Sequence, residues 1–158
     1  MPRDTLSARR KPWIVLWDAK AGPLPPGFGA ADAFLLFDRR SSLAQLDFAA
    51  RSSLEAHPWA TVLVARRWAP VFVSIAARNL HLCVDRAVFV RPAATARAMG
   101  EKIALPLTPL AFPSVVVSGG DGALARHVRA WKSAQVENAA TFLERFSGGL
   151  PAQEHLTA

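Results

Sequence analysis

WATVLVARRWAPVFVSIAARNLHLCVDRAVFVR, residues 59–91, is the most informative stretch of this sequence. It contains four short runs of β-branched and aromatic residues, at 60–65, 71–76, 80–84 and 87–91, which are typical of strands. The connections between these runs are shorter than the dozen or so residues that a crossover helix needs. The stretch therefore predicts an antiparallel β-meander.

Further elements are expected on both sides of this meander. Apolar runs predict strands at 13–17, 33–37, 103–107 and 114–118. Ser42 and Gln45 form a capping-box pattern, and the apolar spacing that follows predicts a helix over 43–56. An apolar stripe predicts a second, amphipathic helix over 123–146.

Together these elements predict a mainly β (α+β) fold, an antiparallel β-sandwich with a C-terminal amphipathic helix. The alternative is an α/β fold with a mixed sheet. The helix at 43–56 and the strand–glycine–helix order near residue 118 favour that alternative.

Composition predicts one globular domain. The chain has 158 residues, of which 51% are hydrophobic and 20% are charged. We expect a flexible basic arm over 1–12, the domain over 13–150 and a tail over 151–158. No apolar run is long enough to cross a membrane, and the run at 13–17 is too short for a signal peptide, so a cytoplasmic location is expected.

Metal and cofactor sites are not indicated. The chain has one cysteine, Cys83, and four histidines that do not cluster at ligand spacing. No Gly-x-Ser-x-Gly occurs, so a nucleophile elbow of that type is absent from the sequence. We therefore expect no metal, no cofactor and no enzymatic activity.

Glycines follow the predicted strand at 114–118. Ser118, Gly119, Gly120, Asp121 and Gly122 resemble the Gly-Gly-Asp-Gly motif of diacylglycerol kinases and NAD kinases, with Ala123 where those families usually carry Thr. A strand, a glycine turn and a helix N-terminus together favour anion binding. The resemblance implies a phosphate or nucleotide site, and the alternative is a turn in which Asp121 caps a helix.

A second resemblance covers His57 to Phe112. The segments His57-Pro58-Trp59-Ala60, Ala69-Pro70-Val71-Phe72-Val73-Ser74 and 86–92 resemble the cupin-type sensing domain of AraC-type transcription regulators. Metal-binding cupins carry Pro-x-Gly-x-x-His, whereas this chain has Ala94 and Arg97 at the Gly and His positions. The resemblance therefore implies a cupin without its metal, in which Arg97, His57, Trp59 and His81 bind a small anionic ligand.

Three functions follow from these observations. The first is a non-catalytic ligand-sensing or dimerisation domain, linked to transcription regulation, that pairs with a second copy or a partner protein through the 123–146 helix. The second is an α/β domain that binds a phosphate or nucleotide at the 119–122 turn. The third is a basic subunit of a nucleoprotein assembly, because the net charge of +7 and the arm at 1–12 suit nucleic acid.

Overall fold

The main sheet is entirely parallel. The computed structural model describes residues 11–24, 30–117 and 125–136, and every structural statement below refers to these residues. They contain six sheet strands: β1 (Trp13–Trp17), β2 (Ala33–Leu36), β3 (Ala60–Ala65), β4 (Val84–Val90), β7 (Ser114–Val117) and β8 (Ala134–Val136). Their order across the sheet is β2-β1-β3-β4-β7-β8.

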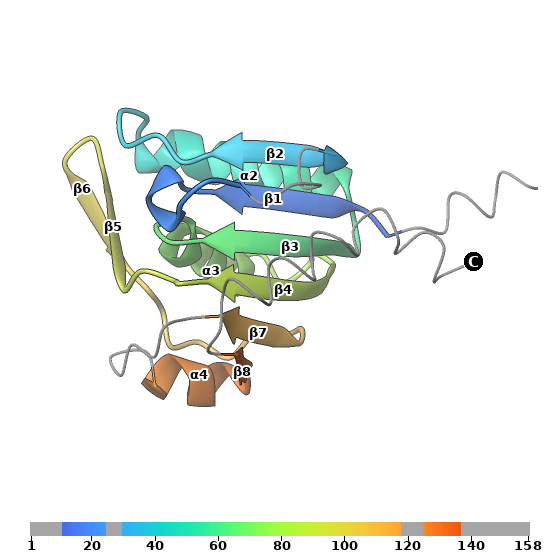
Figure 1. The fold of residues 1–158 in the computed structure, drawn as a ribbon. Coiled ribbons are helices and arrows are strands. Elements are labelled where there is room, and N and C mark those ends of the chain that lie inside the picture. Colours follow the sequence, from blue (N-terminus) through green and yellow to red (C-terminus); the bar gives the residue numbers. More distant parts are fainter. Residues whose placement is uncertain (1–10, 25–29, 118–124, 137–158) are drawn as a thin grey trace, which may run out of the picture.

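A hairpin and four helical segments complete the described fold. The hairpin consists of β5 (Thr95–Ala98) and β6 (Glu101–Ala104), which pair antiparallel. The helices are α2 (Leu43–Ala56), α3 (Trp68–Arg78) and α4 (Ala125–Trp131), and a short 3-10 turn, η1 (Ala19–Ala21), follows β1. Figure 1 shows α2 and α3 on one face of the sheet and the hairpin beyond the ends at which the strand arrows point.

Both faces of the sheet are buried. In β1, Ile14 and Leu16 pack into the cluster that contains α2 and α3 residues, whereas Trp13, Val15 and Trp17 belong to a cluster on the opposite face. The opposite cluster includes residues of the β1–β2 connection. Central parallel strands such as β1 are therefore apolar on both sides, and apolar and polar residues do not alternate along them.

The prediction for α2 is confirmed in detail. The helix spans Leu43–Ala56, the predicted range. The Ser42 hydroxyl accepts a hydrogen bond from the Gln45 N–H at 3.0 Å, and the Gln45 side chain accepts one from the Ser42 N–H at 2.8 Å. Leu46, Ala50 and Leu54 are the buried face.

The predicted meander is wrong, because its second strand is a helix. Residues 71–76 lie inside α3, and the runs at 80–84 and 87–91 are replaced by the single strand β4. Almost every side chain from Trp68 to Ile75 is buried, since α3 packs against the sheet, α2 and the hairpin. Burial on most sides removes the polar stripe that marks a surface helix, and β-branched residues then suggest a strand.

The antiparallel sandwich is therefore overturned, and so is the cupin resemblance. The segment Ala69–Ser74 that carried part of that resemblance is helical. The α/β alternative is correct as to class, although the main sheet is parallel and not mixed. The predicted helix over 123–146 is also wrong as one element: α4 ends at Trp131, and β8 follows at Ala134–Val136. Residues 123–124 and 137–146 of that prediction lie outside the described residues.

Candidate functional site

Polar residues gather where the strands end. In open parallel sheets, ligands bind outside the carboxyl ends of the strands, where the direction of strand addition reverses. Here the chain passes from β1 to β2 on one side and then returns to β3 on the other, so the reversal lies between β1 and β3. Asp18 follows β1, Arg66 and Arg67 follow β3, and Arg91 follows β4.

Asp18 and Arg67 form a buried ion pair at the point where the strand order reverses. The Asp18 carboxylate is fully buried and accepts hydrogen bonds from Arg67 Nε and Nη2, both at 2.8 Å. It also accepts the backbone N–H groups of Arg67 and Lys20, each at 3.0 Å. The Arg67 guanidinium lies 4.6 Å from the centre of the Phe37 ring, so this charge is both paired and covered.

The pKa values of this pair reflect the contact. Burial alone would raise the pKa of Asp18, but the hydrogen bonds from Arg67 and Lys20 outweigh it and leave that pKa below its usual value. The hydrogen bond to Asp18 raises the pKa of Arg67. Both groups are therefore ionised at neutral pH, and the charge of Arg67 is compensated within the protein.

Arg66 and Arg91 differ from Arg67 in having no carboxylate partner in the described chain. The Arg66 guanidinium donates to the backbone carbonyl of Arg91 at 3.0 Å, and the Arg91 guanidinium donates to that of Ala21 at 3.5 Å. The two residues follow neighbouring strands, and the Arg66 N–H donates to the Val90 carbonyl. Two positive charges thus lie at adjacent strand ends, and among the described residues their guanidiniums donate to peptide carbonyls and to no carboxylate.

The backbone is strained at both arginines. Arg66 has a φ of 47° and Arg91 a φ of 46°, in the left-handed region. Each such conformation costs a residue with a side chain about 1–2 kcal/mol. Strain of this kind concentrates at functional sites, where the surrounding structure holds a side chain in place.

A second group of arginines lies at the same end of the fold. Arg39 and Arg40, from the β2–α2 connection, and Arg97 of β5 line an open pocket of about 550 Å³, together with Met99 and Gly100 of the hairpin turn. The Met99 N–H donates to the Arg39 carbonyl at 2.9 Å, which joins the hairpin tip to this connection.

The predicted ligand-binding residues lie at two opposite ends of the sheet. His57 caps the C-terminal end of α2, Trp59 precedes β3, and His81 precedes β4, so all three lie toward the amino ends of the strands. His81 lies 3.7 Å from Glu55, near the end of α2. Arg97 lies beyond the carboxyl ends, on the hairpin. The alternative anion site, Ser118 to Gly122, lies outside the described residues.

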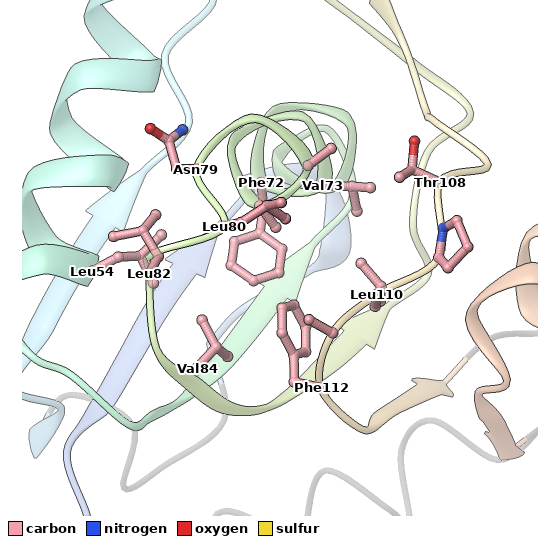
Figure 2. A pocket seen from close by; sticks show the side chains of 14 residues that line it. Leu54, Phe72, Val73, Asn79, Leu80, Leu82, Val84, Thr108, Leu110 and Phe112 are labelled. Carbon is pink, nitrogen blue, oxygen red and sulfur yellow. The ribbon is translucent and has the colours of Figure 1, made fainter.

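An apolar pocket on the α3 side is too small for a substrate. Its volume is about 50 Å³, whereas ligand pockets measure roughly 300 Å³ or more. Figure 2 shows the Phe72 and Phe112 rings side by side in it, next to Val84 and Leu80. The Asn79 amide at its rim donates to the Ile75 carbonyl.

Two absences hold for the described ranges. They contain no group of three or more His, Cys, Asp or Glu side chains that could hold a metal ion. None of their helices combines the length and apolar character needed to cross a membrane.

Sequence reasoning missed Arg66 and Arg91. Arg66 was placed in a connection between predicted strands of the meander, and Arg91 at the end of the predicted strand 87–91. The available signal was that each arginine directly follows an uninterrupted apolar run, at 60–65 and at 87–90. In a parallel sheet, such positions meet at one edge.

Comparison with known proteins identifies the fold but no family. No protein-family model matches the chain, and no curated protein matches it. Among solved structures, the chain is similar to a protein of Pectobacterium atrosepticum that is described as a 'putative YdeN-like hydrolase'. The TM-score is 0.57 at 15% sequence identity, over 98% of this chain and 95% of that chain. The chain therefore has an α/β-hydrolase-like fold.

This comparison corrects the functional predictions. The cupin-type sensing or dimerisation function linked to transcription regulation rested on a fold that the chain does not have. The prediction that the chain is not an enzyme is contradicted as well, because it went with the wrong fold, and the fold found is one that the chain shares with a protein described as a hydrolase.

Arg66 occupies a sharp, strained turn between a strand and a helix, since β3 ends at Ala65, Arg66 has a positive φ, and α3 begins at Trp68. The side chain at this turn is a guanidinium. Its chemistry is anion binding, and it cannot act as a hydroxyl or thiol nucleophile.

Proposed function

We propose that this chain binds a small substrate bearing a carboxylate or phosphate group at the carboxyl edge of its sheet, with Arg66 and Arg91 as the residues that hold the anion. The observation that carries the proposal is that both guanidiniums donate to backbone carbonyls at adjacent strand ends and pair with no described carboxylate. The cytoplasmic location expected from the sequence is retained as part of the proposal.

The chemistry of arginine supports this assignment. A guanidinium is always charged and presents its N–H groups in a planar fork that matches carboxylate and phosphate oxygens. Hydrogen bonds between ionised groups are roughly twice as strong as those between neutral groups. An arriving anion would therefore replace the carbonyl contacts of Arg66 and Arg91 with stronger ones.

Isothermal titration with inorganic phosphate and with acetate tests the proposal. Arg66→Gln and Arg91→Gln should each weaken binding about tenfold, because one charge-assisted hydrogen bond is worth about that much. Arg86→Gln is the matched control, since Arg86 lies toward the amino end of β4 and its nearest acidic partner is Asp85. Absence of binding by the wild type, or equal losses in all three variants, would overturn the proposal.

Hydrolysis of an anionic ester is a second candidate, and the strained turn at Arg66 favours it. Water would attack the ester carbonyl, because Arg66 is not a nucleophile. Arg66 would donate hydrogen bonds to the oxyanion that forms, a contact that lowers the barrier in many acyl transfers. The acyl C–O bond then breaks, and the proton lost by the water goes to the departing alkoxide, giving an acid and an alcohol.

A pair of chromogenic esters tests this candidate. The hemisuccinate ester of p-nitrophenol carries a carboxylate, whereas p-nitrophenyl acetate does not. Hydrolysis should be faster for the anionic ester. Arg91→Gln should remove that preference, whereas Arg66→Gln should slow the hydrolysis of both esters. Equal rates for the two esters in the wild type, or unchanged rates in Arg66→Gln, would reject the hydrolysis candidate; the binding proposal is tested separately by the titrations above.

A further inference from the structure

The pocket at the hairpin tip is built from two segments that are distant in sequence. Arg39 and Arg40 come from the β2–α2 connection, and Arg97 comes from β5. The Met99 N–H bond to the Arg39 carbonyl fixes one segment against the other. The two segments that carry the arginines therefore keep a defined relative position.

The charges in this pocket are mostly uncompensated. Arg40 lies 3.3 Å from Asp38, but neither Arg39 nor Arg97 forms an ion pair with any described residue. Elsewhere in the described chain, carboxylates do pair with bases: Asp47 lies 2.5 Å from Arg78 and 3.4 Å from Arg51, and Asp85 lies 2.7 Å from Lys11. Arg39 and Arg97 thus join Arg66 and Arg91 as arginines at the carboxyl edge that form no ion pair with a described residue.

Met99 forms an apolar wall of this pocket in a conformation that methionine rarely adopts. Met99 and Gly100 form a two-residue hairpin turn with φ values of 50° and 80°. Turns with two positive φ values favour Asn-Gly or Gly-Gly. Met99 is nevertheless 64% exposed, so packing against the core does not account for a methionine at this position.

The pocket lies within reach of the site at Arg66 and Arg91. β2 and β3 flank β1, so they are two strand spacings apart, about 10 Å. Arg39 follows the end of β2 by three residues, and Arg66 directly follows β3. The two groups of arginines thus follow strands that are about 10 Å apart at the same edge of the sheet, a distance that one small molecule can span.

We infer that the pocket lined by Arg39, Arg97 and Met99 is a second anion subsite. The substrate class is then an elongated molecule with an anionic group at each end and an apolar middle. One end binds Arg66 and Arg91, the other end binds Arg39 and Arg97, and Met99 contacts the apolar part. This inference rests on the proposed function, because it needs the first site to hold an anion.

A series of α,ω-dicarboxylates, from succinate to dodecanedioate, tests the inference by isothermal titration. Affinity should rise to a maximum where the two carboxylates are about 10 Å apart. The dicarboxylate at this maximum should bind about tenfold more tightly than the monocarboxylate of equal chain length. Arg97→Gln and Arg39→Gln should each abolish this gain.

Lys102→Gln is the matched control. Lys102 is opposite Arg97 in the hairpin register and is exposed, but it does not line the pocket. It should retain the full gain. A flat chain-length series with intact acetate binding, or a gain that survives Arg97→Gln and Arg39→Gln, overturns the second subsite alone. Loss of all anion binding in the wild type overturns the proposed function, and the inference with it.

Discussion

Asp18 and Arg67 are 49 residues apart in the sequence and are joined by two side-chain hydrogen bonds of 2.8 Å across the point where strand order reverses. This contact ties the end of β1 to the first turn of α3. It also neutralises the charge of Arg67. The neighbouring Arg66 keeps its charge free of any described carboxylate, which is why the proposed anion site is assigned to Arg66 and not to Arg67.

Removal of the carboxylate should destabilise the fold. Asp18→Ala leaves the mostly buried Arg67 guanidinium without its partner, and breaking a buried pair in this way costs about 3 kcal/mol. The loss should appear as a lower urea midpoint. Asp38→Ala is the control, because the Asp38–Arg40 pair is exposed, and it should leave the midpoint nearly unchanged. Equal effects of the two variants would contradict the structural role of the Asp18–Arg67 pair.

The same pair predicts how stability depends on pH. The pKa of Asp18 in the folded protein lies below its usual value of 3.8. The unfolded chain therefore binds the proton first, and the stability that the ion pair contributes is fully present above pH 3.8. It is lost as the pH falls through the lower, folded pKa. Urea titrations at acidic pH should show a shallower decline for Asp18→Asn than for the wild type, and identical slopes would contradict this prediction.

Arg66→Gly separates the role of the side chain from that of the backbone. Glycine relieves about 1–2 kcal/mol of left-handed strain, and its greater freedom in the unfolded chain offsets about 0.5–1 kcal/mol of that gain. Loss of the hydrogen bond to Arg91 offsets about 1 kcal/mol more. Thermal unfolding should therefore change little, while phosphate affinity falls about tenfold. Wild-type affinity in a stably folded Arg66→Gly protein would exclude the side chain from the site.

Met99→Gly should increase stability. The turn at Met99–Gly100 needs positive φ values at both positions, and glycine adopts them without a steric cost. After the entropy of glycine in the unfolded chain is included, the gain should be about 0.5–1 kcal/mol, measured by urea denaturation. A loss of stability would show that the exposed Met99 side chain makes contacts that stabilise the fold.

Local signals in the sequence were sufficient for some elements. The helix at 43–56 follows from Ser42, Gln45 and one apolar face, all of which depend on neighbouring residues only. The strands at 13–17 and 60–65 were also predicted, because their apolar runs are uninterrupted. Apolar and polar residues do not alternate in these runs. This pattern indicates burial on both faces of the strand, which is typical of parallel sheets.

The topology depended on one segment that local signals misrepresent. Residues 71–76 are rich in β-branched and aromatic side chains, yet they form the buried part of α3. Once these residues are read as a strand, no crossover connection remains between 60–65 and 87–91, and a parallel sheet is excluded. The meeting of Arg66 and Arg91 at one edge then cannot be anticipated, because it follows from parallel pairing of β3 and β4.

Arginine side-chain spectra offer the most direct test of the anion site. The Nε–H resonances of nitrogen-labelled protein, assigned with the arginine variants, would be followed during a titration with phosphate. Arg66 and Arg91 should shift in a saturable way and with one common affinity, while Arg86 and Arg78 stay in place. Shifts spread evenly over all exposed arginines, or shifts at Arg86 and Arg78 without any at Arg66 and Arg91, would contradict an anion site at the carboxyl edge.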